Sequence, residues 1–382
     1  MELLGKSKEE LKAFCASLGE APYRGAQIYH ALYAERKFDF TRITNLPAGL
    51  RDRLSQEAHI TLPEVKQRFT SADGSVRYLL GLPPGEDRRS ARRASVEAVF
   101  MPSAGRQTIC ISTQAGCAVD CHFCLTAQLG LIRNLSAGEI IGQVLVALRD
   151  AGNDTMTRDG SENAAKHAGA TGAGGLAPQT NIVLMGQGEP LLNFEAVMAA
   201  LRILLDPRGL TISPKHATLS TSGIVPGIEQ LGQERVRPKL AISLNASNDE
   251  QRDELMPINK KYPLSALMEA CRNYPLRTWE HLTFEYVMLG GLNDSPDDAQ
   301  RVVRLLAPLK SVKVNLIPWN PAELSYRESS PERIEEFRRI LVDRGVPAFV
   351  RYSRGRDVMA ACGQLALLNI SDASGEALRQ QK

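Results

Sequence analysis

Apolar and polar positions change their spacing along the chain, and each change marks a predicted region. The first 64 residues are rich in helix formers with apolar residues at helical spacing, as in residues 9–14 (EELKAF). Ser7 stands three residues before Glu10, which is the pattern of a capping box at a helix start. We therefore predict that residues 1–64 form a small helical domain.

Residues 65–105 have a different pattern, because short alternating segments are separated by turn residues. The segments 65–70 and 75–80 flank Asp73-Gly74, a pair that strongly favours a tight hairpin turn. Another strand is predicted at residues 96–100. This region is therefore interpreted as a β-hairpin and a linker that leads into the rest of the chain.

From about residue 106, apolar strands alternate with amphipathic helices. The predicted strands are 108–112, 181–185, 217–221, 239–244, 282–288 and 313–318, and 346–353 is a candidate edge strand. Helices are predicted between them, for example at 137–149, 194–204 and 296–306. Six strand–helix units predict a parallel sheet that right-handed crossovers curl into part of a barrel. The fold class is therefore α/β, a partial (βα)6 barrel over residues 106–370, short of the eight units of a full barrel.

Two segments show neither the helical spacing nor the strand alternation of apolar residues. Residues 152–180 are rich in Gly, Ala, Asn and Thr, which predicts a loop insertion within one strand–helix unit. Residues 371–382 are predicted to be a disordered tail.

Composition and charge narrow the class of protein. The 382 residues are 43% hydrophobic, enough for one large domain and a smaller one. There is no apolar run of membrane-spanning length and no signal-peptide core, so we expect a cytoplasmic protein with no membrane partner. The formal net charge is only +3, so any nucleic-acid surface must be local. The strongest basic run is Arg88, Arg89, Arg92 and Arg93, and phosphate contact is its preferred role.

Three of the seven cysteines, Cys117, Cys121 and Cys124, lie within eight residues. In a cytosolic chain such clustering indicates metal or redox chemistry more than a disulfide framework. Soft sulfur ligands suit zinc or an iron–sulfur cluster. A structural zinc ion would need a fourth ligand, and His122 is the only nearby candidate. Because His122 lies between two of the cysteines, we expect its ring to point away from them.

The C-x3-C-x2-C spacing, placed just after the first barrel strand, resembles that of the radical S-adenosylmethionine (SAM) superfamily. There, three cysteines hold a [4Fe-4S] cluster whose fourth iron chelates SAM, and reduction of the cluster yields a 5′-deoxyadenosyl radical. The resemblance implies a [4Fe-4S] cluster and SAM as cofactors, with Cys117, Cys121 and Cys124 as the iron ligands. It also implies an electron donor such as flavodoxin.

Glycine and polar residues follow several of the predicted strands, where parallel folds bind ligands. The second strand ends in Gly188 and Glu189, where a bare glycine lets the backbone approach a ligand and a carboxylate can accept from an ammonium group. The SAM-contacting residues that the resemblance implies are Gly188, Glu189, Ser220, Ser243, Leu244, Asn245 and Asn320. A simpler role for the two serines is to cap the following helices.

Four further segments sharpen the resemblance. These are 110–117 (CISTQAGC), 255–261 (LMPINKK), 315–321 (NLIPWNP) and 357–365 (DVMAACGQL). Together they are similar to the RlmN-type enzymes, dual-specificity adenine C2 methyltransferases of 23S rRNA and tRNA. The likeness runs from about residue 20 to 368; the insertion, Gln187 and Asn245 depart from it, the last standing where the family usually carries histidine.

The family resemblance implies a role for two isolated cysteines. One SAM methylates Cys362, a second SAM activates that methyl group as a carbon radical, and the radical adds to the adenine ring. Cys110 then attacks, releasing the product and leaving a disulfide. Glu97 matches the family's proton acceptor. Simpler roles are a buried strand residue for Cys110, a packing residue for Cys362 and a surface strand residue for Glu97.

The resemblance thus predicts methylation of C2 of an adenosine in 23S rRNA and of a tRNA adenosine next to the anticodon. The helical N-terminal region would be an accessory RNA-binding domain, and we expect a monomer. Two rivals stay open. One is a Cfr-type enzyme, which methylates C8 with the same cysteines. The other is an iron–sulfur or zinc protein that binds RNA without catalysis.

Overall fold

The computed structural model describes residues 1–83, 94–152 and 179–367. Arg88, Arg89, Arg92 and Arg93, the tail 371–382 and most of the insertion 152–180 lie outside the described residues. The two last positions of the insertion belong to a strand instead, because Gln179 and Thr180 pair with the first barrel strand.

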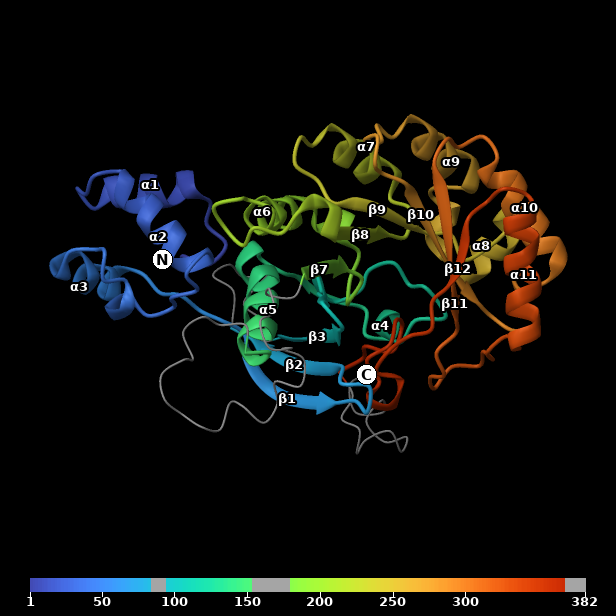
Figure 1. Cartoon of the computed structure of the whole chain (residues 1–382), viewed down its shortest axis with the longest axis horizontal. Coiled ribbons are helices and arrows are strands. Elements are labelled where there is room, and N and C mark those ends of the chain that lie inside the picture. Colours follow the sequence, from blue (N-terminus) through green and yellow to red (C-terminus); the bar gives the residue numbers. More distant parts are fainter. Residues whose placement is uncertain (84–93, 153–178, 368–382) are drawn as a thin grey trace.

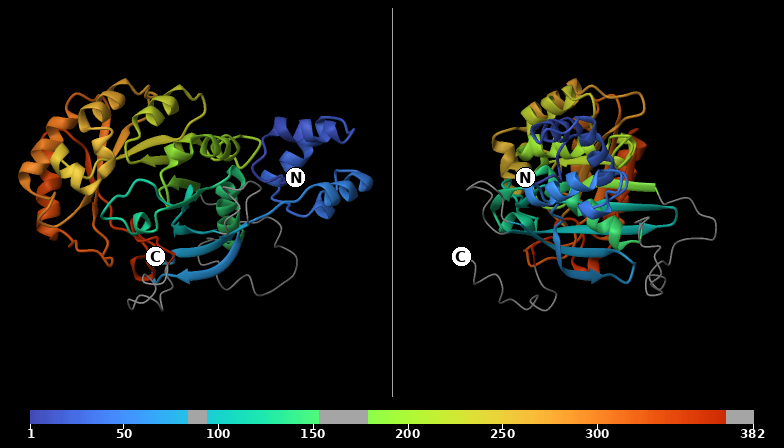
Figure 2. Two further views of the ribbon diagram at one scale, coloured as in Figure 1. Left: turned by 180° about the vertical axis from the view of Figure 1, so that it is seen from behind. Right: turned by 90° about the vertical axis from the view of Figure 1, so that its left-hand side faces the viewer.

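The N-terminal region is helical, as its pattern predicts. It contains α1 (Lys8–Ser17), α2 (Tyr23–Tyr33), η1 (Phe40–Arg42) and α3 (Ala48–Glu57). The capping box is confirmed, since Ser7 accepts from the amide of Glu10 and the Glu10 side chain accepts from the amide of Ser7. Figures 1 and 2 show these helices at one end of the molecule. The hydroxyl of Tyr29 donates to Asp206 at 2.9 Å, which ties this region to the barrel.

Gly25 lies where α2 packs directly against the backbone of α1. A Cβ atom at Gly25 would overlap the backbone of Lys12 and Leu11. We therefore expect Gly25→Ala to destabilise the protein by about 1–3 kcal/mol through overpacking, although alanine favours helix. Urea denaturation of the full chain measures the effect. Gly49→Ala in α3 is the matched control, because a Cβ there meets nothing within 4 Å; equal behaviour of the two variants would contradict the close-packing explanation.

A ten-stranded sheet forms the centre of the molecule, in the order β1-β2-β3-β4-β7-β8-β9-β10-β11-β12. Its antiparallel part is β1 (Glu64–Thr70), β2 (Val76–Leu82), β3 (Ala94–Ser103) and β4 (Arg106–Cys110). The parallel part continues from β4 through β7 (Gln179–Leu184), β8 (Ala217–Thr221), β9 (Lys239–Ser243), β10 (Leu282–Met288), β11 (Val312–Pro318) and β12 (Ala348–Val350). The six predicted barrel strands and the edge strand are thus found, with some changes in their bounds. The first strand spans Arg106–Cys110 and not 108–112, β7 begins two residues before the predicted 181, and the edge strand is limited to Ala348–Val350 within the predicted 346–353.

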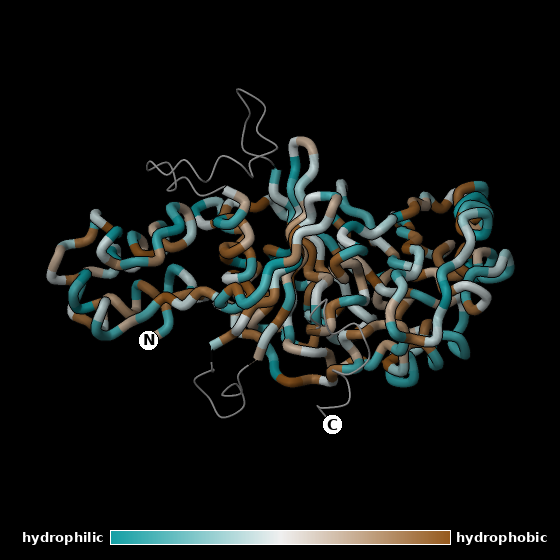
Figure 3. The backbone as a smooth tube through the Cα atoms, turned by 90° about the horizontal axis from the view of Figure 1, so that it is seen from below, coloured by the Kyte–Doolittle hydropathy of each residue, from teal (hydrophilic) through white to brown (hydrophobic). Residues whose placement is uncertain are grey.

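Helices follow the parallel strands and cover the outer face of the curved sheet (Figure 1). The longer ones are α5 (Ala137–Asp150), α6 (Phe194–Leu204), α7 (Val225–Gln233), α8 (Asp249–Leu255), α9 (Leu264–Asn273), α10 (Pro296–Leu306) and α11 (Pro331–Asp343). Short helical turns lie in the connections, namely η3 (Pro190–Asn193), η4 (Pro214–His216), η5 (Pro257–Lys260) and η6 (Arg356–Val358). Figure 3 shows hydrophilic segments along the periphery at the end away from the N-terminus. None of the helices in the described ranges is long and apolar enough to cross a membrane.

The alternation of side chains along each strand sorts residues between the helix-covered face and the concave face. In β10, Phe284 and Tyr286 are buried in the main apolar core, whereas Glu285 lies on the other face. A smaller sheet, of β5 (Gln114–Gly116) and β6 (Leu131–Asn134), adjoins the loop that carries the three clustered cysteines. The concave face and this loop together position the candidate site.

Candidate active site

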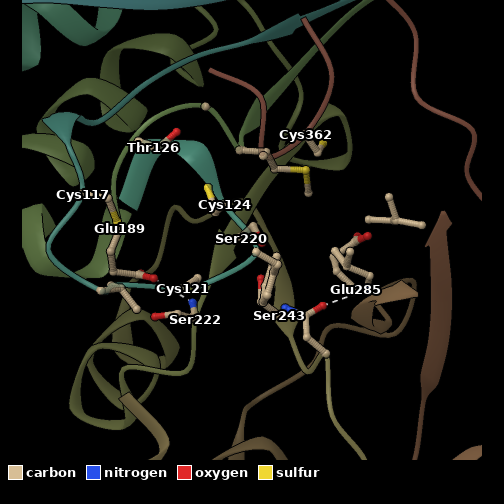
Figure 4. Close-up of a pocket in the computed structure, with 18 of the residues that line it drawn as sticks. Cys117, Cys121, Cys124, Thr126, Glu189, Ser220, Ser222, Ser243, Glu285 and Cys362 are labelled. Atoms are coloured by element: carbon tan, nitrogen blue, oxygen red, sulfur yellow. Dashed lines mark hydrogen bonds between the residues drawn. The ribbon is translucent and has the colours of Figure 1, made fainter. Parts of the chain in front are cut away.

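A pocket with about 970 Å³ of empty space, part of it open to solvent, lies at the carboxyl ends of the parallel strands (Figure 4). The lining residues used below are Cys117, Cys121, Cys124, Thr126, Gly186, Gly188, Glu189, Ser220, Ser222, Ser243, Asn245, Glu285, Asn320 and Cys362. They come from segments more than 240 residues apart in the sequence, which the parallel sheet gathers at one edge.

The three clustered cysteines enter the pocket from the loop between β5 and α4 (Leu125–Gln128). All three are free and half-buried. Burial raises the pKa of the Cys117 thiol to about 11, and burial also raises the pKa of Cys121 and of Cys124. A bound metal centre would hold the three cysteines as thiolates, because metal binding displaces the thiol protons.

The loop does not form a closed site for a single metal ion. Among the described residues, no three or more His, Cys, Asp or Glu side chains are gathered closely enough to hold one metal ion. The ring of His122 lies toward Asp120, with His122 Nε2 3.8 Å from Asp120 Oδ2, and does not line the pocket. The arrangement disfavours a Cys3His zinc site. It suits an iron–sulfur cluster, in which each cysteine binds its own iron.

Glu189 offers a buried carboxylate to the pocket. Its two oxygens accept from the backbone amides of Leu191 at 3.1 Å and Ser222 at 2.7 Å. Burial raises the pKa of this carboxyl group, and the hydrogen bonds from Ser222 and Leu191 oppose the rise. The carboxylate is thereby held in one orientation while it borders the pocket, as binding of an ammonium group requires.

The glycines beside Glu189 have a different role from the one their sequence suggests. Gly188 has a φ of +96°, and a Cβ atom there would overlap Gln114. A Cβ atom at Gly186 would overlap Ser112 and the backbone of Ile111. Both glycines line the pocket. A side chain is excluded at each of them because the backbone packs against the protein's own segment after β4, and not because a ligand must approach.

Polar strand ends complete the wall of the pocket. Ser220 and Ser243 line it and do not cap the next helices, because the N-caps of α7 and α8 are Ile224 and Asn248. Asn245 also lines it, and its side-chain oxygen accepts from the amide of Val287 at 2.8 Å. These positions fit a ligand-binding role better than a capping role.

Leu244 is the one expected SAM contact whose side chain lies elsewhere, because it is buried in the main apolar core. Beside it, the buried guanidinium of Arg252 donates to the carbonyls of Leu244, Ser222 and Ser243. Burial lowers the pKa of Arg252 to about 10. Arg252 therefore fixes three strand-end carbonyls, a function that its place in α8 does not reveal in the sequence.

The pocket fits a SAM molecule and a sulfur-ligated cluster on its own chemistry. Three thiols and one oriented carboxylate border the same space. In addition, Ser222 Oγ is buried and has no hydrogen-bond partner among the described residues. Because a buried hydroxyl without a partner is costly, it indicates that a polar ligand belongs here.

Cys362 lies at the pocket on a segment held by several contacts. Asn320 Nδ2 donates to the carbonyl oxygen of Cys362 at 3.0 Å. The backbone amide of Leu125 donates to the carbonyl oxygen of Gly363 at 2.8 Å. Thr126 Oγ1 donates to the carbonyl of Leu365 at 2.6 Å. Although Cys362 is exposed, the protein around its sulfur and the nearby Glu285 raise the pKa of its thiol to about 11.

Cys110 ends β4 and is buried beneath the same segment. It packs in a small apolar cluster with Val99, Val358, Ala360 and Leu365. Burial raises the pKa of the Cys110 thiol, and the neighbouring Cys362 raises it further. The two cysteines are thus brought near each other, both as free thiols. Cys15 and Cys271, in contrast, pack in the main apolar core.

Glu97 lies outside the pocket lining, with 0% of its surface exposed, and is therefore not a surface residue of β3. Its carboxylate forms an ion pair with the buried Arg77 and accepts from the amide of Leu367 at 3.0 Å. Burial raises the pKa of Glu97, and the charge of Arg77 opposes the rise. In this conformation Glu97 holds the chain beyond Cys362 and does not face the pocket.

Glu285 is a pocket residue that the sequence reasoning missed. It is buried in β10 and accepts from Asn315 Nδ2 at 2.9 Å, and burial raises the pKa of its carboxyl group. Figure 4 shows it across the pocket from Glu189. A charged residue inside an otherwise apolar strand was the signal that could have identified it.

Comparison with known proteins gives consistent results over nearly the whole chain. Residues 1–60 match the ribosomal RNA large subunit methyltransferase N-terminal domain, and residues 171–306 match the radical SAM superfamily. The chain is 47% identical to a probable dual-specificity RNA methyltransferase RlmN of Koribacter versatilis, covering 91% of this chain and 96% of the relative. It is 42% identical to the dual-specificity RNA methyltransferase RlmN of Anaeromyxobacter dehalogenans, covering 96% of this chain and 91% of the relative.

A solved structure agrees with these relatives. The crystal structure of a radical SAM methyltransferase from Sphaerobacter thermophilus superimposes with a TM-score of 0.84 at 40% identity. The match covers 96% of this chain and 100% of that one. The partial-barrel fold and the N-terminal helices therefore occur together in a methyltransferase of the same class.

Proposed function

The chain belongs to the RlmN family of dual-specificity RNA methyltransferases, and from this premise we propose that it methylates C2 of adenosine in 23S rRNA and in tRNA. It is an enzyme of the radical SAM class whose cofactors are a [4Fe-4S] cluster and SAM. Membership of this family favours C2 over the C8 position of the Cfr-type alternative. It also disfavours a protein that binds RNA without catalysis.

The observation that carries the proposal is that four cysteines border one pocket while a fifth is buried beneath one of them. Cys117, Cys121 and Cys124 border it from one side, and Cys362, with Cys110 beneath it, lies on the C-terminal side. The first three would hold the cluster, and Glu189, Ser220, Ser243 and Asn320 would hold SAM. When bound, the cluster and SAM supply the one-electron chemistry that an unactivated C–H bond requires.

The proposed role of Cys362 is to carry the methyl carbon. Adenine C2 is electron-poor and cannot attack a methyl donor directly, whereas a thiolate can. The Cys362 sulfur takes up the methyl group, and its carbon is later joined to the ring as a thioether. Because the resting thiol has a raised pKa, the Cys362 proton must leave when the sulfur attacks.

Cys110 is proposed to release the product. Its thiolate attacks the Cys362 sulfur, so that an S–S bond forms while the S–C bond breaks, and the electron pair stays with the RNA carbon. That carbon takes up a proton and becomes the methyl group. The shared apolar cluster of Cys110 and Leu365 supports this role, since it keeps the buried thiol next to the Cys362 segment.

Glu97 is proposed to accept the proton that leaves the ring, and the single excess electron that then remains on the ring would return to the bound cluster. Its carboxylate is occupied by Leu367 and Arg77 in this structure, so the segment after Cys362 must first move aside. A raised pKa suits a carboxylate that has to take up a proton. Movement of this segment stays a prediction.

Product analysis tests the proposed reaction. The enzyme, with its cluster reconstituted anaerobically, is supplied with SAM, a reductant and fragments of 23S rRNA or tRNA. Mass spectrometry of the nucleosides against C2 and C8 standards is expected to find 2-methyladenosine. 8-Methyladenosine would overturn the C2 assignment and keep the cysteine mechanism. Absence of any methylated base, with intact cluster and bound RNA, would overturn the proposed function.

Several finer features belong to the same proposal. Residues 1–64 are proposed as the accessory RNA-binding domain, residues 65–105 as the linker and residues 106–370 as the catalytic barrel, and the match of residues 1–60 supports the first division. We propose that the enzyme acts as a monomer in the cytoplasm. Flavodoxin, or a donor of the same kind, would supply its electrons.

A further inference from the structure

The concave face of the sheet continues beyond the pocket toward the amino ends of the strands. Ser243 in β9 and Glu285 in β10 line the pocket, and residues two positions earlier on a strand share their face. On β9, Lys239 lies four positions before Ser243. On β11, Lys313 pairs with Thr283 of β10, two positions before Glu285. Both lysines therefore lie on the pocket's face, roughly 7–14 Å from the pocket lining along the strands.

Three cations stand along this part of the face. They are Lys239, Lys313 and Arg351, which follows the edge strand β12. Burial is the main cause that lowers the pKa of Lys313 and of Lys239. Repulsion between neighbours adds to it, since the charge of Arg351 lowers the pKa of Lys313 and the charge of Lys313 lowers the pKa of Lys239. Within the described ranges none of the three forms an ion pair.

The nearest carboxylates are engaged with other groups. Glu280 pairs with Arg237 and Arg277. Glu285 accepts from Asn315, whose own side-chain oxygen accepts from Arg351 Nε at 3.1 Å. Glu280 and Glu285 attract the two half-buried lysines, but neither carboxylate lies within ion-pair distance of a cation of this group among the described residues. Neighbouring like charges without an ion-pair partner weaken the folded state, so this group of cations indicates an anionic partner.

An exposed aromatic residue lies beside these cations. Phe349 pairs in register with Asn315 and is 46% exposed, and the guanidinium of Arg351 lies 5.5 Å from its ring centroid. Tyr352, just after Arg351, is 64% exposed. Cations interleaved with open aromatic rings are typical of surfaces that bind single-stranded nucleic acid, with phosphates on the cations and bases on the rings.

We propose that Lys239, Lys313 and Arg351 form a phosphate-binding track for the RNA substrate on the concave face, with Phe349 as a stacking platform for an unpaired base. The proposal rests on the proposed function and names the surface by which the RNA reaches the pocket. Arg351 contacts Asn315, which contacts Glu285 in the pocket lining, so the track is continuous with the site.

Salt-dependent RNA binding tests the track. Affinities of the full-length protein for a labelled 23S rRNA fragment are measured by fluorescence anisotropy at several salt concentrations. For Lys239→Gln/Lys313→Gln the slope of log affinity against log salt is expected to fall by about 1.4, since each lost single-strand phosphate contact removes about 0.7. Arg351→Gln should lower the slope by about 0.7. Because Arg351 is exposed, this variant is expected to fold normally and still tests the track if the double variant misfolds.

Two controls make the result specific. Arg304→Gln/Arg339→Gln removes the same charge from exposed positions on the outer helices α10 and α11 and should leave the slope unchanged. Phe349→Ala should weaken binding with an unchanged slope, because stacking releases no counterions. Competition by inorganic phosphate at constant ionic strength distinguishes a site for free phosphate from one that needs the RNA strand.

The outcomes separate the track from the reaction. If wild-type protein methylates RNA and the track variants keep its affinity and salt slope, the track is wrong and the proposed function stands. If wild-type protein neither binds nor methylates RNA, the proposed function itself fails. Displacement by inorganic phosphate as effectively as by RNA would overturn the RNA assignment of the track.

Discussion

Cys362→Ala is expected to abolish the formation of methylated adenosine, with a loss on the order of 10³-fold or more. Without the sulfur there is no atom to carry the methyl carbon, and direct attack by adenine C2 is not available. The substitution itself is mild, because Cys362 is exposed and the surrounding segment is held through its backbone by Asn320 and Leu125. Nucleoside mass spectrometry measures the product, and the mass of the intact protein shows whether a methyl group resides on Cys362.

Two further cysteine variants sharpen this experiment. Cys110→Ala removes the attacking sulfur but leaves Cys362, so RNA is expected to remain covalently attached to the protein and to be visible on a denaturing gel. Cys15→Ala is the matched control, since Cys15 is buried in the apolar core and has no proposed role. Undiminished methylation by Cys362→Ala would overturn the carrier role, and equal loss in Cys15→Ala would attribute the effect to stability.

Arg77→Met is expected to reduce the free energy of unfolding by about 3–5 kcal/mol, because it leaves a buried carboxylate without its counter-charge. Arg77 is 1% exposed and Glu97 0% exposed, and the guanidinium also lies over the ring of Phe69, 4.2 Å from its centroid. Urea denaturation measures the loss. Arg304→Met, at an exposed position on α10, provides the control for removing an arginine.

The pH dependence identifies the cause of that loss. Burial already raises the pKa of Glu97 above its ordinary 4.5, and removal of Arg77 raises it further. A carboxyl group with a higher pKa in the folded state stabilises the fold below its unfolded pKa, and this contribution disappears as pH rises through the folded-state pKa. The destabilisation of Arg77→Met relative to wild type should therefore be smallest near pH 4.5 and grow with increasing pH.

A second substitution checks this explanation. In Arg77→Met/Glu97→Gln the side chain at position 97 can no longer be charged, so much of the stability is expected to return and the additional pH dependence to vanish. A loss that is the same at every pH, and that the second substitution does not relieve, would show that packing on Phe69 dominates.

Local patterns in the sequence were sufficient to predict the secondary structure and to propose the candidate reactive groups. The alternation of strands with amphipathic helices predicts each barrel strand, and 217–221 and 282–288 coincide with β8 and β10. Such patterns work because side-chain period and capping are properties of neighbouring residues. The spacing of Cys117, Cys121 and Cys124 is equally local, since a short loop carries the three proposed ligands.

The sequence by itself thus determined the class of protein and the parallel order of its barrel, and it supplied the candidates for the residues whose chemistry the reaction needs. Only the tertiary structure decided which of those residues meet. It placed Leu244 in the core, brought Cys110 beneath the Cys362 segment and paired Glu97 with Arg77. It also recruited Glu285 to the pocket. Burial, charge pairing and contact across distant segments are properties of packing between elements, and no local pattern in the chain encodes them.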